Sequence, residues 1–230
     1  MEAGDKFGSR DNIELGVQSA LSTFYGATFR RETRSLLLFP DEAGVKPCLL
    51  VLLCCAVQGA TLRYWVQPCA KRSSGCRAGD PELAQWAMEA WQSASGGALT
   101  LEKTDNKDKA QIRIFWAEGE RGMYGEARPI VVDGLRGAEV FVLPSIAPAD
   151  LPDVLLRESI VYLTCLHETG HAIGLPHTAA FEDIMYSFQY GGDITEYFAR
   201  YRRLIPARSD IRKHSGISAQ DSKKVSALYR

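Results

Sequence analysis

The sequence predicts an α+β domain, and two periodic patterns carry that prediction. Short runs of alternating residues rich in β-branched and aromatic types recur between positions 62 and 143, which is typical of strands. Two longer segments, one over 80–95 and one from 154 onward, repeat apolar residues at helical spacing instead. With 46% hydrophobic and 24% charged residues and a net charge of -1, the chain can bury a sizeable core. Because it has no basic excess, we expect no nucleic-acid partner.

The predicted strands lie in the middle of the chain. A charged turn separates the second from the third, and a glycine-punctuated stretch over 119–137 contains two short extended pieces. The predicted strands are 62–66, 99–103, 111–117 and 139–143, and the extended pieces are 124–128 and 130–132.

The first predicted helix begins with Asp80-Pro81-Glu82, which offers an N-cap, a first-turn proline and an acidic first turn. It runs to about Ser95 and stops at the following glycine pair. Its apolar stripe predicts core packing and consists of Leu83, Trp86, Ala87, Ala90 and Trp91.

The second predicted helix begins near Val154, and its apolar stripe is continuous with His167. After position 185 we expect mostly loops, until Ser218 caps a closing helix that ends at Tyr229.

Residues 167–177 read HETGHAIGLPH and place three of the four histidines at the spacing of metal ligands. On a helix, His167 and His171 lie one turn apart on the same face, so both can reach one metal ion. Glu168 is turned aside and is placed to hold a water molecule. Gly174 can adopt a positive φ, which lets the chain leave the helix and return His177 as a third ligand. Three ligands leave one position open, as in catalytic zinc sites.

The pattern H-E-x-x-H-x-x-G-x-x-H resembles the metzincin clan of zinc endopeptidases. In that clan a methionine follows in a tight turn beneath the metal, and Met185 supplies it here. Thr178 after the last histidine and the Ile-Met-Tyr turn are most similar to the matrixin family. Some clan members carry a tyrosine ligand where this chain has Ser187. Matrixins commonly continue with a proline and a later tyrosine that wall the specificity pocket, whereas this chain reads SFQYGG over 187–192.

The resemblance implies a metzincin-like fold. This is a twisted mixed β-sheet with a backing helix and an active-site helix, followed by a small loop-rich C-terminal subdomain with a closing helix. It also implies a zinc-dependent endopeptidase in which Glu168 is the general base toward a metal-activated water. We expect a monomer acting on a protein or peptide substrate. The edge strand near Gly125, Glu126 and Ala127 is the candidate for pairing with an extended substrate. The alternative is a secreted zinc-held binding domain without turnover, which would not need Glu168.

The sequence predicts three segments: a polar extension over 1–44, a signal peptide over 45–59 and a catalytic domain over 60–230. The apolar run 48–57 follows Lys46 and precedes small residues, which is the layout of a secretory signal, although a buried core segment is the alternative. Ten residues are too few to span a bilayer as a helix. We therefore expect a secreted protein, extracellular or periplasmic, with no stable membrane anchor after cleavage. Translation could begin near Val45, or 1–44 could be a pro-segment.

Removal of the signal leaves three cysteines. Cys69 and Cys76 could close a small disulfide loop, with a zinc knuckle as the rival that lacks a second ligand pair. We expect Cys165 to pack as a small apolar residue.

Calcium is a second candidate metal. Asp133, Asp150 and Asp153 are acidic loop positions that could supply oxygen ligands, although scattered carboxylates are usually solvated. We expect His214 to be solvated. An arginine cluster is interpreted as a solvated rim, with acidic substrate contacts as the alternative, and consists of Arg200, Arg202, Arg203, Arg208 and Arg212.

Overall fold

The computed structural model describes residues 59–70, 72–118, 124–146 and 153–230. The predicted extension 1–44 and the signal peptide, apart from its last residue, lie outside the described residues. No helix in the described part of the chain is long and apolar enough to cross a membrane.

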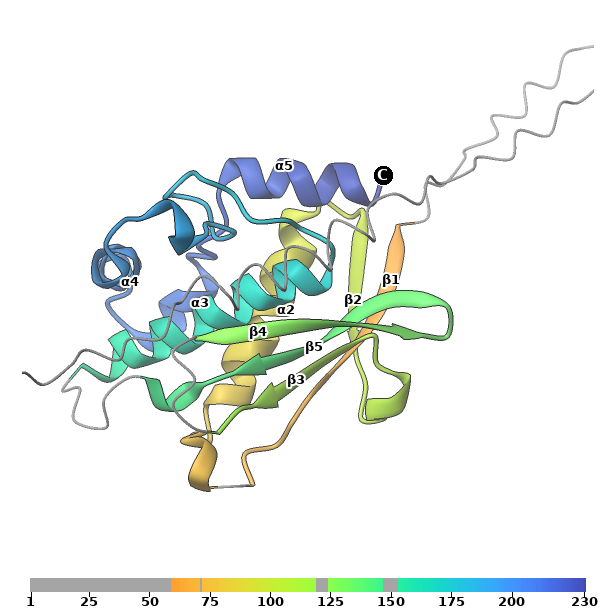
Figure 1. Ribbon diagram of the computed structural model, residues 1–230, viewed down its shortest axis with the longest axis horizontal. Helices are drawn as coiled ribbons and strands as arrows, with labels where there is room; N and C mark the ends of the chain where they lie inside the picture. Colours follow the sequence, from red (N-terminus) through yellow and green to blue (C-terminus); the bar gives the residue numbers. More distant parts are fainter. Residues whose placement is uncertain (1–58, 71, 119–123, 147–152) are drawn as a thin grey trace, which may run out of the picture. The chain divides into compact units, whose positions relative to one another are not determined.

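The sheet is mixed, as predicted, and its five strands have the order β2-β1-β3-β5-β4 (Figure 1). Four strands pair in parallel: β1 (Ala60–Val66), β2 (Leu99–Lys103), β3 (Ile112–Trp116) and β5 (Leu135–Val142). The edge strand β4 (Gly125–Val132) runs antiparallel to β5. The two predicted extended pieces are thus one continuous strand.

Two helices, α2 (Asp80–Ala94) and α3 (Val154–Ala172), pack against one face of the sheet (Figure 1). Alternate strand residues point toward them and are buried, whereas their neighbours in sequence are more exposed. The two helices also contact each other directly, since the Trp91 Nε1–H donates to the Leu166 carbonyl at 2.8 Å. The core therefore lies between the sheet and this helix pair.

Asp80 does not cap α2 with its side chain, so the predicted N-cap is wrong. The cap position is Gly79, without a side-chain cap hydrogen bond, and Asp80 is the first helical residue. Its carboxylate accepts the Arg77 N–H at 2.8 Å and is otherwise committed to a tertiary ion pair. The first-turn proline and the acidic first turn are confirmed.

The chain after the metal motif contains more helix than predicted. Helix α4 (Ile194–Arg202) lies in the segment that was expected to be loop, and Asp193 caps it by accepting the Thr195 and Glu196 N–H groups. The closing helix α5 (Ala219–Leu228) is confirmed, together with its cap at Ser218. Helix α4 is short, and its tyrosines and phenylalanine face the core. Its local signals, the Asp193 cap and apolar residues at helical spacing, agree with the helix, and burial of that face stabilises it.

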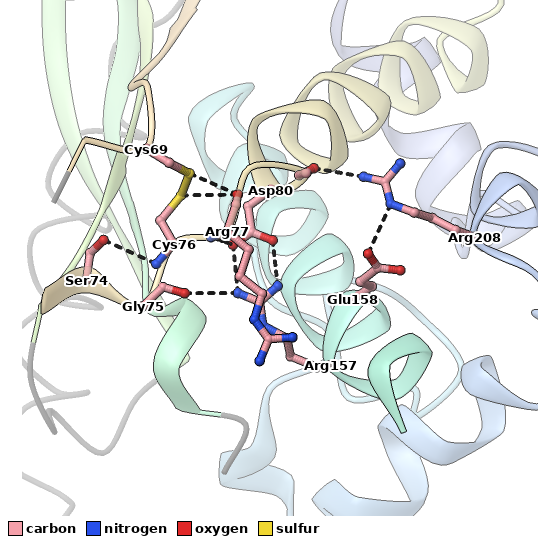
Figure 2. A network of polar contacts seen from close by, with 10 residues as sticks. Cys69, Ser74, Gly75, Cys76, Arg77, Asp80, Arg157, Glu158 and Arg208 are labelled. Atoms are coloured by element: carbon pink, nitrogen blue, oxygen red, sulfur yellow. Dashed lines mark hydrogen bonds and ion pairs between the residues drawn. A yellow bond between two sulfur atoms is a disulfide. The ribbon is translucent and has the colours of Figure 1, made fainter. Parts of the chain in front are cut away.

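A buried ion pair joins the first turns of α2 and α3 (Figure 2). The Arg157 guanidinium donates to both Asp80 carboxylate oxygens, at 2.6 and 2.7 Å, and to the Gly75 carbonyl at 3.2 Å. Asp80 is 1% exposed and Arg157 3% exposed. The Cys69–Cys76 disulfide closes the loop that presents Gly75, so the predicted bridge is part of this joint. Cys165 is free and buried, as expected.

The arginine cluster matches the predicted solvated rim only in part, because Arg203 and Arg212 are exposed whereas Arg200, Arg202 and Arg208 are half-buried. Four of its members form ion pairs with carboxylates of the same chain, and the fifth, Arg200, lies over aromatic rings. The pairs are Arg202 with Asp153, Arg203 with Glu196, Arg208 with Glu82 and Glu158, and Arg212 with Glu89. His214 is exposed, as predicted.

Replacing Asp80 by Ala should lower the free energy of unfolding by about 3–5 kcal/mol, because it leaves the Arg157 charge buried without a partner. Urea denaturation of the two proteins measures the difference. As a matched control, Glu196→Ala removes a solvent-exposed partner of Arg203 and should change stability little. Equal losses of unfolding free energy in the two variants would show that burial of the Asp80–Arg157 pair does not increase the cost of removing one partner.

Candidate metal centre

Helix α3 carries the first two histidines and ends in a turn that returns the third. The Gly174 N–H donates to the His171 carbonyl and the Leu175 N–H to the Gly170 carbonyl, which is the Schellman pattern. Gly174 has a φ of 96°, so its predicted role in ending the helix is confirmed. The chain then reverses and brings His177 back toward the helix.

The three histidines converge on one point. His177 Nε2 lies 3.2 Å from His167 Nε2 and 3.1 Å from His171 Nε2. Three nitrogens about 2.0–2.1 Å from a tetrahedral zinc ion would lie about 3.3 Å apart. The three ligand atoms therefore lie close enough to bind one metal ion, as the sequence predicts.

Backbone carbonyls orient two of the rings. His167 Nδ1 lies 2.6 Å from the Ile184 carbonyl oxygen, and His171 Nδ1 lies 2.9 Å from the Leu175 carbonyl oxygen. A carbonyl can only accept, so each Nδ1 carries the proton and each Nε2 presents its lone pair. This is the outer-shell arrangement that holds a metal-binding imidazole in place.

Burial keeps the histidines neutral. It lowers the pKa of His167 well below the usual value, and the neighbouring His171 and His177 lower it further. Burial also lowers the pKa of His171, and burial together with His171 lowers the pKa of His177 to about 4. At neutral pH all three rings are uncharged, which is the form that binds a metal ion.

The Glu168 side chain extends from α3 to the edge strand β4. A Cβ atom on Gly125 would come within 2.6 Å of Glu168 Cγ and 3.0 Å of its Oε1, so only glycine allows this approach. Burial, and to a smaller degree Glu126, raise the pKa of the Glu168 carboxyl to about 8. A divalent cation nearby would favour the ionised form.

Met185 packs directly beneath the histidine helix and is fully buried. A Cβ atom on Gly170 would overlap the Met185 sulfur, so the missing side chain between the two helical histidines makes room for the methionine. The Met185 carbonyl accepts the Thr178 N–H at 2.8 Å, which ties the methionine turn to the residue after the third ligand. Met185 and Thr178 were predicted from the sequence but Gly170 was not, although its helical spacing relative to the histidines was the available signal.

The two edges of the sheet differ. Side chains at the end of α2 cover the β2 edge, since Ser95 Oγ at the C-cap accepts the Leu99 N–H and Gln92 Oε1 accepts the Leu101 N–H. On β4, the Tyr124 carbonyl accepts from Leu143 N–H, so alternation turns the peptide groups of residues 125, 127, 129 and 131 away from β5. The predicted residues Gly125, Glu126 and Ala127 therefore lie on an edge strand beside Glu168.

The two described calcium candidates already have partners. Asp133 forms an ion pair with Arg63, and Asp153 caps α3 and pairs with Arg202. Asp150 lies outside the described residues. Among the described residues, the group of histidines, cysteines or carboxylates close enough to hold a metal ion is His167, His171 and His177.

The sequence matches no protein-family model and no curated protein.

Acid should destabilise the metal-free protein through these histidines. Their folded pKa values are lowered, so their contribution is present above the ordinary pKa of 6.5 and is lost as pH falls toward about 4. As pH falls through that interval, the melting temperature of wild type should therefore fall more than that of His177→Gln. The measurement is thermal unfolding of both metal-free proteins between pH 7.5 and 4.

The exposed His214 offers the control, since His214→Gln should show no such trend. A difference between wild type and His177→Gln that stays constant with pH would contradict the neutral, buried state of His177.

Proposed function

We propose that this protein is a secreted zinc-dependent endopeptidase with a metzincin-like fold, most similar to the matrixins. The observation that carries the proposal is the convergence of three Nε2 atoms, together with the burial of the Glu168 carboxylate, which follows His167 in the chain and is not in the ligand group. A purely structural zinc site has no need of that carboxylate.

The arrangement around the histidines supports the metzincin-like fold. A mixed sheet with an antiparallel edge strand lies against the histidine helix, and a buried methionine turn packs beneath that helix at a glycine. Gly174 and Met185 have the surroundings that the resemblance implies.

The chemistry divides between the metal and the chain. A zinc ion held by His167, His171 and His177 would acidify a water molecule and polarise the scissile carbonyl. Glu168 accepts the proton of the attacking water and delivers it to the leaving amine. The neutral histidines keep their lone pairs available, and the two backbone carbonyls at Nδ1 prevent the rings from turning.

Strand β4 supplies the pairing edge for an extended substrate. Gly125 and Ala127 each present an N–H and a carbonyl outward, and Gly125 lies against Glu168. Pro129 faces the same way but has no N–H. Gly125, Ala127 and Val131 therefore keep both an outward donor and an outward acceptor, and of these Gly125 lies against the catalytic carboxylate.

One observation favours the alternative of a zinc-held binding domain without turnover. The segment after Met185 packs aromatic rings against one another, with Tyr186 and Phe188 at 5.4 Å and Phe188 and Tyr197 at 5.1 Å between centroids. The same segment lacks the proline of matrixins. Rings packed in this way leave less room for a substrate side chain.

Glu168→Gln should keep zinc near one per chain but lower the rate of peptide cleavage by on the order of 10²–10⁴, because it removes the general base and leaves the ligands in place. Cleavage of a diverse peptide library by the purified full chain, with zinc content measured on the same sample, gives both quantities. Glu102→Gln, on the opposite edge strand, is the matched control. Zinc binding without cleavage of any peptide by wild type would move the assignment to the binding domain.

Gly125→Ala should lower cleavage on the order of 100-fold with zinc content unchanged, because the added Cβ displaces the Glu168 side chain by about 1 Å. Steady-state kinetics on the best library peptide measures the effect. The exposed Val131, at the far end of the same strand, gives the control Val131→Ala. Full activity in Gly125→Ala would place Glu168 outside the reaction.

A further inference from the structure

Two residues at the end of α5 contact the turn that joins the second and third histidines. The Tyr229 hydroxyl donates to the Ile173 carbonyl at 2.9 Å, although the two residues are 56 positions apart in the sequence. A Cβ atom on Gly174 would come within 3.1 Å of Leu228 Cδ2, so the Leu228 side chain lies over that glycine. The turn that ends α3 therefore has a tertiary partner that takes no part in the proposed chemistry.

Helix α5 is itself fixed in the core. Val225 and, at the other end of the helix, Asp221 are fully buried, and the Asp221 carboxylate accepts the Ile184 N–H at 2.8 Å. The Tyr229 ring packs against the core. Burial raises the pKa of its hydroxyl to about 12, so the hydroxyl keeps its proton and can donate. The bond to Ile173 therefore comes from a donor whose position is set by packing.

One peptide unit of the turn is held on both sides. The carbonyl of Ile173 and the N–H of Gly174 belong to the same planar peptide group. The N–H donates to the His171 carbonyl at 2.9 Å, and the carbonyl accepts from Tyr229 at the same distance. Because glycine adopts φ values of either sign, this peptide group could rotate at Gly174 with little steric cost. The Tyr229 bond opposes that rotation.

The orientation of this peptide group affects two of the candidate ligands. Leu175 follows it directly, and the Leu175 carbonyl oxygen lies 2.9 Å from His171 Nδ1. His177 comes two residues later, so the same turn determines where its ring returns to the helix. A rotation of the peptide group would displace the acceptor that fixes the His171 tautomer and the backbone that carries His177.

We propose that Tyr229 is a positioning residue for the metal centre, whose hydroxyl holds the Ile173–Gly174 peptide group and through it orients His171 and places His177. The effect on the ligands rests on the proposed zinc site. The hold on the peptide group does not, and it can be measured on the metal-free protein.

Tyr229→Phe removes the hydroxyl and keeps the ring. The matched control is Tyr162→Phe, because the Tyr162 hydroxyl also donates to a backbone carbonyl at 2.9 Å, that of Ser215. Each variant loses one bond of the same kind, so both metal-free proteins should melt about 2–4 °C below wild type. An effect confined to Tyr229→Phe is then distinct from a general loss of stability.

Hydrogen exchange of the Gly174 amide in the metal-free full chain tests the hold on the peptide group. Loss of the Tyr229 hydroxyl should speed this exchange about 5-fold, because local opening of the turn then breaks one bond fewer. In Tyr162→Phe the Gly174 amide should exchange at the wild-type rate. An unchanged rate in Tyr229→Phe overturns the proposal, and so does an equal acceleration in both variants.

Zinc release from the loaded full chain to a chelator tests the link to the ligands. Tyr229→Phe should release zinc on the order of 10-fold faster than wild type, and Tyr162→Phe at the wild-type rate. Release from Tyr229→Phe at the wild-type rate, or equally fast release from both variants, overturns the positioning role alone. A wild type that binds no zinc overturns the metal centre itself and the positioning role with it. None of these results depends on peptide cleavage.

Discussion

Helix α3 packs against the sheet on one side and against the methionine turn on the other. The contact between Gly170 and Met185 allows the methionine turn to approach the helix closely. Any side chain at position 170 would overlap the Met185 sulfur and lie against the Trp91 ring. The turn that carries Met185 also presents the Ile184 carbonyl to His167. The approach of this turn to the helix therefore decides both the floor of the metal centre and the orientation of its first ligand.

Buried charged groups lie at both ends of α3, where one set joins it to α2 and the other fixes the methionine turn. Near its first turns, the Asp80–Arg157 pair joins it to α2 and to the disulfide loop (Figure 2). Beneath its last turns, Asp183 and Asp221 hold the methionine turn. Buried polar groups add little net stability when they are fully paired, but a displaced partner is costly. Such groups oppose displacement of the helix, which suits a centre that needs three nitrogens close together.

The two edges of the sheet differ in whether their backbone groups can pair with another strand. The side chains of Gln92 in α2 and of Ser95 at its C-cap accept two outward N–H groups of β2, which opposes further pairing at that edge. Strand β4 keeps outward peptide groups beside Glu168. The open edge and the metal centre lie together because α3 packs directly against β4 (Figure 1). An extended chain that pairs with β4 would thus reach the carboxylate and the histidines.

The sequence alone determined the features that depend on neighbours along the chain. Helical spacing places His167, Glu168 and His171, a left-handed glycine ends the helix before His177, and alternation locates the strands. Tertiary structure decided the rest, because it depends on residues far apart in sequence. Asp80 lies in a buried ion pair with Arg157 of another helix, and Arg208 pairs with Glu82, which is far away in sequence. Helix α4, by contrast, has local signals of its own, the Asp193 cap and apolar residues at helical spacing. No local pattern specifies which distant residue will meet a given charge in the folded chain.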